Sequence, residues 1–163
     1  MPLPIRELPP ASDLAKLAQG GDVSGVSLVL TLFLTARELY ASTERFFARF
    51  DISDAKWSVL MLLATAPAKR LQPSEIAAKL AVTRATVTGL LKGLERDRLV
   101  TRSADEADGR FDVIRLSRAG AALLRTMMPA LANRHATATA GLSARERQQL
   151  VALLHKVRIP ADD

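Results

Sequence analysis

Residues 72–120 restrict the fold more than any other part of the chain, because two short helices, a turn and two strands are expected there in unbroken succession. Pro73 suits the first turn of a helix, and Glu75 can neutralise the positive N-terminal end of that helix. A second helix is predicted from Thr83, since apolar residues recur with the spacing of one helical face. Those residues are Val87, Leu90, Leu91 and Leu94. The pattern predicts a helix-turn-helix with one buried side.

Two strands are expected directly after the second helix. Residues 99–102 and 111–116 contain β-prone positions, and Asp108-Gly109 between them is a strong turn signal. A helix-turn-helix followed by a β-hairpin is a winged helix, whose second helix can lie in the major groove of double-stranded DNA. The hairpin tip can then reach the phosphates or the minor groove. The predicted fold class is mainly α (α+β), with the winged helix at 53–117.

Long helices are expected on both sides of the winged helix. The helix predicted at 27–49 is apolar on nearly every side in its first half. A helix of this kind must be buried on every side, which in so small a chain suggests a partner subunit. We therefore predict a helical dimerisation region at 27–52 and 118–163. The proline-rich residues 1–26 are predicted to form a flexible N-terminal arm.

Serines mark the starts of three helices. Ser53 and Ser117 are suitable N-caps for helices on either side of the winged helix. Ser143 and Glu146 together form the capping-box pattern that opens the last helix. Pro129 interrupts the helix that follows Ser117, which predicts either a kink or a fresh start.

The composition is that of a globular chain, with 48% hydrophobic and 25% charged residues among 163. The absence of cysteine excludes disulfides and thiolate metal sites. The longest largely apolar run, at 26–36, is too short to span a bilayer, and the N-terminus shows no secretion signal. We therefore expect a cytoplasmic protein with no membrane partner.

The positive charge is concentrated where the winged helix is expected. The net charge is −1 over residues 1–68, +4 over residues 69–118 and +3 over residues 119–163. An excess of this kind is expected for a surface that meets phosphate. A generally basic surface is the alternative, and charge alone does not separate the two readings.

The outward face of the helix that begins at Thr83 combines small residues, hydroxyls and cations. Small residues let a helix sink deep into a groove, and hydroxyls reach phosphates or base edges. The exposed positions are expected to be Arg84, Ala85, Thr86, Thr88, Gly89, Lys92 and Arg96. Gly89 and Gly93 each cost about 1 kcal/mol relative to alanine inside a helix. Close approach to DNA is one explanation for them, and tight packing or drift is the other.

The chain resembles the MarR family of bacterial transcription regulators over about residues 53–124. The segments that carry the resemblance are Pro73-Ser-Glu-Ile-Ala, Val82-Thr-Arg-Ala-Thr-Val-Thr, Leu90-Leu, Leu94-Glu, Leu99-Val, Arg102, Asp108-Gly-Arg110 and Leu116-Ser-Arg-Ala-Gly120. The resemblance implies a homodimer whose N- and C-terminal helices interlock, with one winged helix on each side.

Carried over to this sequence, the resemblance implies a set of DNA-contacting residues. Those on the reading helix are Thr83, Arg84, Thr86 and Thr88. In the wing, Arg110 is implied as the contact for a narrow minor groove, oriented by Asp108, with Arg102 at the hairpin base. An ordinary surface ion pair is the alternative for Asp108 and Arg110.

Three residues depart from the family pattern. Ala81 and Arg98 occupy positions where glycine is usual, so a strained or reshaped backbone is expected at both. Gly89 stands where a basic residue is frequent, which removes one expected contact. These departures bear on sequence preference and affinity rather than on the class of protein.

The mechanism that the resemblance implies is occlusion of a promoter. A two-fold dimer presents two reading helices about 34 Å apart and so selects a pseudo-palindromic operator. A small aromatic or phenolic effector would release the block. The candidate effector residues are Tyr40, Phe46, Phe47, Trp57, Arg37 and Arg45. The alternative is that these residues form core and ordinary helix surface, as aromatics at helical spacing usually do.

Two other classes of function compete with this one. An enzyme needs a nucleophile with a base or paired acids, but the only histidines, His135 and His155, are far apart and no catalytic motif is present. We therefore expect no enzyme, cofactor or metal site. A winged helix can also serve as an architectural or protein-interaction module without reading sequence. Such a module more often exposes apolar residues on the helix, and the sequence does not separate repressor from activator.

Overall fold

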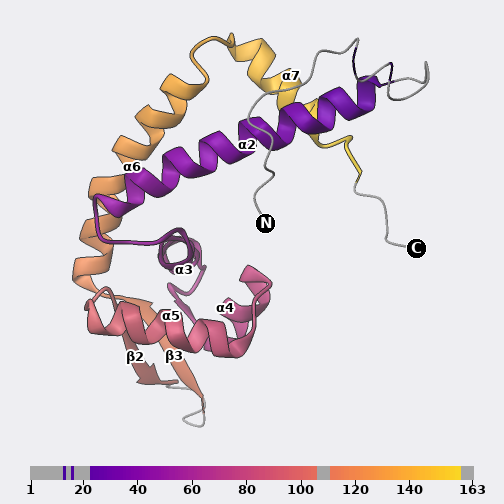
Figure 1. The fold of residues 1–163 in the computed structure, drawn as a ribbon. Coiled ribbons are helices and arrows are strands. Elements are labelled where there is room, and N and C mark those ends of the chain that lie inside the picture. The colour runs from indigo at the N-terminus through magenta and orange to yellow at the C-terminus, as the bar shows by residue number, and fades with distance from the viewer. Residues whose placement is uncertain (1–12, 14–15, 17–22, 106–110, 159–163) are drawn as a thin grey trace, which may run out of the picture. The chain divides into compact units, whose positions relative to one another are not determined.

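The computed structural model describes residues 13, 16, 23–105 and 111–158 of the chain. The chain divides into two compact units, residues 1–58 and 59–163, with the boundary inside one helix (Figure 1). The elements in chain order are α2 (Ser24–Ala48), α3 (Asp54–Thr65), β1 (Arg70–Leu71), α4 (Pro73–Leu80), α5 (Arg84–Arg96), β2 (Val100–Ala104), β3 (Asp112–Leu116), α6 (Arg118–Ala138) and α7 (Ala144–Leu154).

Helix α2 begins three residues before the predicted start and has two different halves. Its C-terminal end is anchored by Phe46 and Phe47, which are 5% and 2% exposed. The ring of Phe47 packs on that of Trp57 from the next helix, with 5.3 Å between the ring centroids. The N-terminal half of α2 instead exposes large apolar side chains within this single chain. They include Val26, Leu28, Val29 and Phe33.

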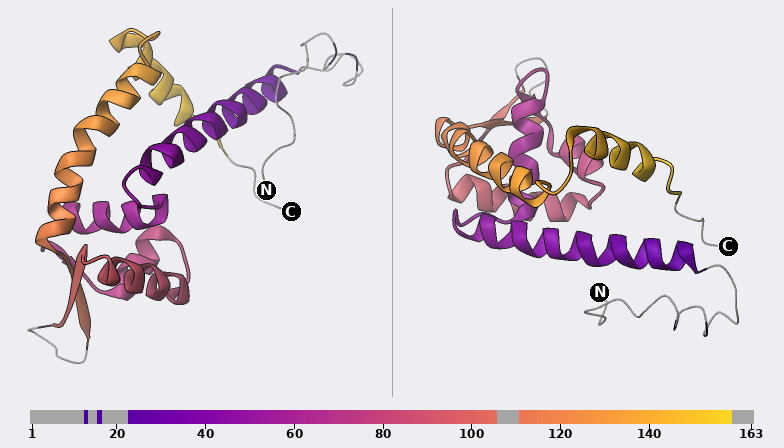
Figure 2. Two further views of the ribbon diagram at one scale, coloured as in Figure 1. Left: turned by 60° about the vertical axis from the view of Figure 1, so that its left-hand side comes forward. Right: turned by 90° about the horizontal axis from the view of Figure 1, so that it is seen from above.

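The second unit contains the helix-turn-helix and the hairpin in the order that the sequence predicts. The three-stranded antiparallel sheet has the order β1-β3-β2, and β2 and β3 form the hairpin (Figure 2). The predicted winged helix and the mainly α (α+β) fold class are confirmed. The two-residue strand β1 was not predicted, because it is too short to carry a pattern and is defined only by its pairing with β3.

The turn between α4 and α5 and the turn after α5 both use a left-handed backbone. Ala81 has a φ of 53° and Arg98 has a φ of 57°. These are the two positions where the family pattern favours glycine, so the unusual backbone expected there is present although both residues carry a Cβ. The left-handed backbone at Ala81 and Arg98 therefore carries a conformational cost.

The helices after the sheet begin at the predicted caps. The Ser117 side chain accepts a hydrogen bond from the backbone N–H of Gly120, and the Ser143 side chain accepts one from the backbone N–H of Glu146. Helix α6 is a single helix with Pro129 inside it, so this proline does not start a new helix. No residue of α7 is buried, and its apolar stripe is exposed. That stripe consists of Leu150, Val151, Leu153 and Leu154, and Val157 continues it beyond the helix end.

Within the part of the chain that the structure describes, no helix has both the length and the apolar character needed to cross a membrane.

Candidate nucleic-acid interface

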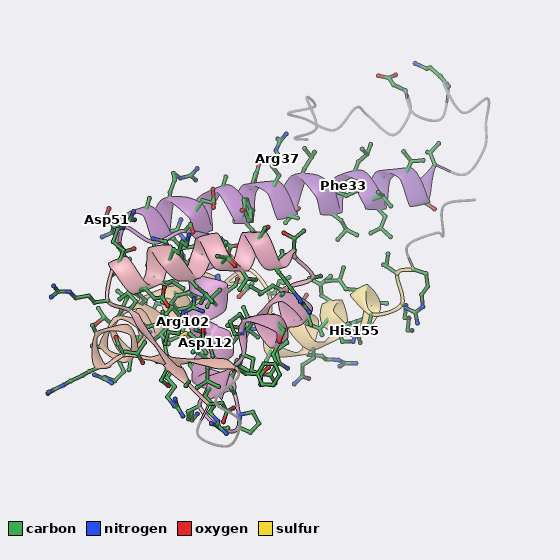
Figure 3. The ribbon with its side chains drawn as sticks, turned by 90° about the horizontal axis from the view of Figure 1, so that it is seen from below. Phe33, Arg37, Asp51, Arg102, Asp112 and His155 are labelled. Carbon is green, nitrogen blue, oxygen red and sulfur yellow. The ribbon has the colours of Figure 1, made fainter. Side chains whose placement is uncertain are left out.

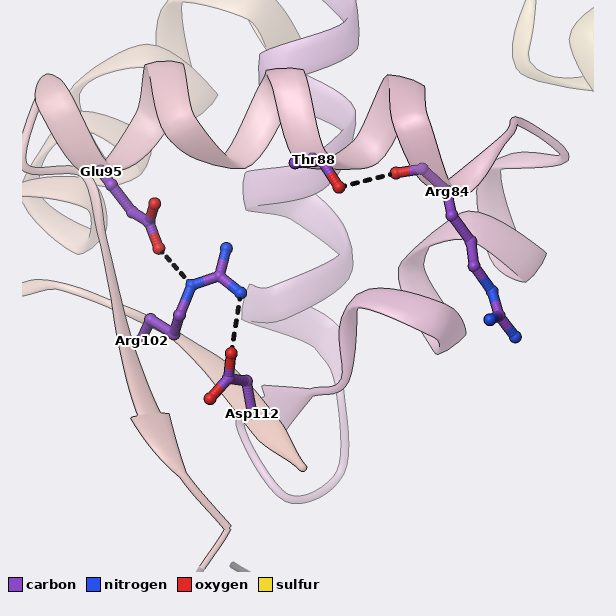
Figure 4. Close-up of polar contacts among 5 residues, drawn as sticks. All are labelled: Arg84, Thr88, Glu95, Arg102 and Asp112. Carbon is purple, nitrogen blue, oxygen red and sulfur yellow. Dashed lines mark hydrogen bonds and ion pairs between the residues drawn. The ribbon is translucent and has the colours of Figure 1, made fainter. Parts of the chain in front are cut away.

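The first turn of α5 is fixed by hydroxyl groups. The Oγ1 of Thr83 accepts a hydrogen bond from the backbone N–H of Thr86 at 3.1 Å, and the two threonine hydroxyls lie 2.9 Å apart. The hydroxyl of Thr88 donates to the carbonyl oxygen of Arg84 at 2.9 Å (Figure 4). These bonds fix the orientation of the three hydroxyls within the helix and its cap.

The predicted reading residues of α5 and its N-cap are exposed, whereas the apolar stripe of the helix is buried. Its buried side is formed by Val87, Leu91 and Leu94, and Leu90 is half-buried. The predicted contacts Thr83, Arg84, Thr86 and Thr88, and the further cation Lys92, are all exposed. The side chain of Arg84 extends away from the helix (Figure 4). All five residues are therefore accessible along the reading helix and its N-cap.

Gly89 lies on this exposed face with open space beside it. A Cβ added to Gly89 would meet no atom within 4 Å. Packing among the residues that the structure describes therefore does not require glycine at this position. Of the two explanations that the sequence allows, close approach to a ligand is compatible with this open space.

Arg102 of β2 is held by carboxylates from two other elements. Its Nε lies 2.7 Å from Glu95 Oε1 on α5, and its Nη1 lies 3.1 Å from Asp112 Oδ2 on β3 (Figure 4). Figure 3 shows Arg102 and Asp112 side by side. The hydrogen bond with Glu95, followed by that with Asp112, raises the pKa of the Arg102 guanidinium, against the opposing effect of its partial burial. One cation thus ties the reading helix to both strands of the hairpin.

Two further polar pairs hold the opposite face of the sheet. Arg70 Nη1 lies 3.1 Å from Asp105 Oδ1, and Arg115 Nη1 donates to Ser103 Oγ at 2.8 Å. Sequence reasoning missed both pairs, because the first depends on the placement of the short strand β1 and the second on the register between β2 and β3. The backbone N–H of Asp105 donates to the carbonyl of Phe111 at 2.8 Å, so the hairpin is paired up to the last described residues on each side.

The wing tip lies outside the described residues. Asp108 and Arg110, the predicted wing contacts, both fall within the undescribed segment 106–110. Their roles therefore rest on the sequence.

The residues predicted for an effector site divide into two groups. Phe46, Phe47 and Trp57 are buried, as the core alternative expects. Tyr40 is 56% exposed, and its hydroxyl donates to Glu44 Oε1 at 3.3 Å. The negative charge of Glu44 raises the pKa of the Tyr40 phenol. Arg45 is exposed and Arg37 is half-buried.

Among the described residues, no group of three or more histidine or acidic side chains is placed to hold a metal ion. His135 and His155 are both exposed. The capping Ser143 lowers the pKa of Glu146 through hydrogen bonds, which fits a role in starting α7.

Comparison with known proteins agrees with this geometry. A model of the MarR family matches residues 50–110. The HTH-type transcriptional repressor YetL of Bacillus subtilis (strain 168) is 35% identical over 133 residues, which cover 82% of this chain and 80% of that protein. The homoprotocatechuate degradative operon repressor of Escherichia coli is 30% identical over 131 residues, which cover 80% of this chain and 86% of that protein.

Solved structures share the fold. The S. aureus MepR–DNA complex has a TM-score of 0.66 at 26% identity, covering 82% of this chain and 94% of that chain. A mutant of E. coli MarR complexed with operator DNA has a TM-score of 0.70, covering 85% of this chain and 100% of that chain; at 23% identity it supports the fold alone. The chain belongs to the MarR family and is a DNA-binding transcriptional regulator, not an enzyme.

Proposed function

We propose that the protein is a repressor that binds a pseudo-palindromic operator as a homodimer. The observation that carries this proposal is the exposed face of α5, where three oriented hydroxyls, Arg84 and Lys92 gather beside the open space at Gly89. Such a face suits the major groove, because hydroxyls and arginine contact phosphates and base edges while small residues permit close approach. The named relatives in Bacillus subtilis and Escherichia coli are repressors.

The proposed dimer is supported by the apolar faces that a single chain leaves exposed. Phe33 on α2, labelled in Figure 3, is 54% exposed, and Leu153 on α7 is 49% exposed. Each belongs to a set of large apolar residues rather than standing alone. Large apolar residues exposed in sets, as on each of these two helices, are typical of a protein interface, and a second copy of the chain would cover them.

The two-fold symmetry of a dimer determines the symmetry of the operator that it binds. Two reading helices related by a two-fold axis contact half-sites about one turn of DNA apart, or about 34 Å. An operator that overlaps a promoter would then be unavailable to polymerase while the dimer is bound. The wing residues Asp108 and Arg110, which lie outside the described residues, are proposed to contact the flanking minor groove.

A small aromatic effector is proposed to release the DNA. One relative is the repressor of a homoprotocatechuate degradative operon, which supports an aromatic compound as the class of effector. The accessible candidates to receive it are Tyr40, Arg37 and Arg45, since a phenol and two cations suit an aromatic acid. Phe47 and Trp57 would have to leave the core to take part.

The proposal is tested by selecting bound duplexes from a random DNA library with the purified protein at near-physiological salt. Enrichment of a two-fold pseudo-palindrome with half-site centres about ten base pairs apart is the expected result. If bulk DNA is shifted but no sequence is enriched, the protein is architectural. If no DNA is bound, the α5 face serves a protein partner instead.

Arg84→Ala is expected to weaken binding to the selected operator by about 1–3 kcal/mol, because it removes an exposed cation from the first turn of the reading helix. Fluorescence anisotropy titrations of wild type and variant on the same duplex measure this change. Arg125→Ala is the matched control, since Arg125 is an exposed arginine of α6 outside the reading face. An equal loss in both variants would show that only overall charge matters.

A further inference from the structure

The ion-pair cluster of Glu95, Arg102 and Asp112 joins three elements of the winged helix at one point. Glu95 belongs to the last turn of α5, Arg102 to β2 and Asp112 to β3. The proposed reading residue Arg84 lies eleven residues before Glu95, or about 16 Å away along the helix axis. The cluster therefore sits at the opposite end of the reading helix from its DNA-contacting turn, where the hairpin leaves the helix.

We propose that Arg102 is a positioning residue, which sets the angle of the wing against α5 and thereby determines operator specificity, rather than a residue that contacts phosphate. This inference rests on the proposed function, because it concerns how the same reading surface is held. It differs from the role that family resemblance implies for Arg102 at the hairpin base.

The hydrogen-bonding geometry favours positioning. The guanidinium directs its Nε to Glu95 and its Nη1 to Asp112, at 2.7 and 3.1 Å. The planar fork of arginine matches carboxylates and fixes their relative orientation. The Arg102 side chain is only 33% exposed, and those of Glu95 and Asp112 are 30% and 50% exposed. Two of its three nitrogens are thereby directed at carboxylates, whose negative charges oppose the approach of a phosphate.

The net charge of the cluster also favours a positioning role over a phosphate contact. Two carboxylates and one guanidinium give the cluster a net charge of −1, within a segment whose overall charge is positive. A net negative cluster does not attract the DNA backbone. Its presence beside a reading helix is explained if its task is to hold the hairpin. The angle between the wing and α5 matters because a dimer must place two reading helices and two wings on the DNA at the same time.

The decisive variant is Glu95→Gln, for which the two roles predict opposite results. If Arg102 contacts phosphate, removing Glu95 frees the cation and removes a repulsive charge, so both operator and scrambled duplexes should bind more tightly. If Arg102 positions the wing, affinity for the selected operator falls while affinity for a scrambled duplex of equal length does not. We expect the specificity ratio to fall about fivefold, the scale of a partly exposed ion pair.

Asp97→Asn is the matched control, because Asp97 directly follows the same helix and pairs with its neighbour Arg96 at 3.3 Å. The control removes the same charge near the same end of α5 and leaves the pair of Glu95 and Arg102 in place. A specificity ratio that changes equally in Glu95→Gln and Asp97→Asn would overturn the positioning role. A protein that enriches no operator at all would instead refute the proposed function.

Two further measurements separate positioning from a phosphate contact. Arg102→Ala should leave the slope of log affinity against log salt unchanged, whereas loss of a phosphate contact lowers that slope by about one for each protomer. In the free protein, amide hydrogen exchange in β2 and β3 should quicken in Glu95→Gln and not in Asp97→Asn. This readout needs no operator, and unchanged hairpin exchange in Glu95→Gln would overturn the inference by itself.

Discussion

Gly120→Ala is expected to destabilise the protein by about 3 kcal/mol or more, and so to lower its melting temperature by about 6–12 °C. A Cβ at this position would overlap the backbone carbonyl oxygen of Leu99. Overpacking against a flexible side chain is relieved by a new rotamer, but a backbone carbonyl moves only with its chain. Thermal unfolding followed by circular dichroism, at one fixed protein concentration, measures the change.

The surrounding hydrogen bonds prevent an easy relief of this clash. The Leu99 carbonyl accepts the backbone N–H of Ser117 at 3.0 Å, and the Ser117 hydroxyl donates to the Arg98 carbonyl at 2.7 Å. The same Ser117 oxygen accepts the N–H of Gly120 at 2.9 Å. Moving Ser117 and the first turn of α6 away from Leu99 would therefore break both bonds to residues 98 and 99, whereas moving Gly120 alone would break the cap that starts this helix.

Gly89→Ala is the matched control, since Gly89 is also a helical glycine but has open space beside it. This substitution should stabilise the protein by up to about 1 kcal/mol through helix propensity alone. Equal melting temperatures for the two alanine variants would contradict the close approach of α6 to Leu99.

The elements of the fold could be predicted from the sequence because their signals are local. Thr83, Ser117 and Ser143 each cap the helix that follows them, and the apolar spacing after Thr83 identifies the buried side of α5. A cap and a helical stripe depend only on residues within a few positions. The unusual backbone at Ala81 was expected on different grounds, since the family resemblance places it where glycine is usual.

The partners of Arg102 could not be predicted, because they depend on tertiary register. Glu95 lies seven residues before it in a helix, and Asp112 lies ten residues after it across a hairpin. Nothing in the local sequence shows that both carboxylates converge on one guanidinium. The resemblance to a family named Arg102 as a DNA contact, whereas the geometry supplies a different role that can be tested.

The aromatic residues show a similar division. Tyr40, Phe47 and Trp57 are separable only by their surroundings: packing buries the last two and leaves Tyr40 exposed. An aromatic residue in a helix is compatible with core or with a binding surface until its neighbours are known.

The first turn of α2 was not predicted, because Ser24 carries no strong start signal and the helix has no side-chain cap.

Leu153→Asp is expected to convert the protein from a dimer to a monomer at micromolar concentration. Leu153 belongs to the exposed apolar stripe of α7, where no residue is buried within the single chain. Burying a carboxylate without a partner in an apolar interface costs more than such an interface contributes at one position. The protomer itself should remain folded, because Leu153 is 49% exposed before any partner arrives.

Affinity for the operator should fall at least about a hundredfold when the dimer is lost, because a monomer cannot contact both half-sites at once. Sedimentation velocity measures the mass, circular dichroism confirms the helix content, and anisotropy on the selected operator measures affinity. Gln148→Asp is the matched control: it adds the same charge to α7 on the side opposite the apolar stripe, since five residues turn a helix by about 140°. A dimer that survives Leu153→Asp, with operator affinity intact, would show that the apolar stripe of α7 faces something other than a second copy of this chain.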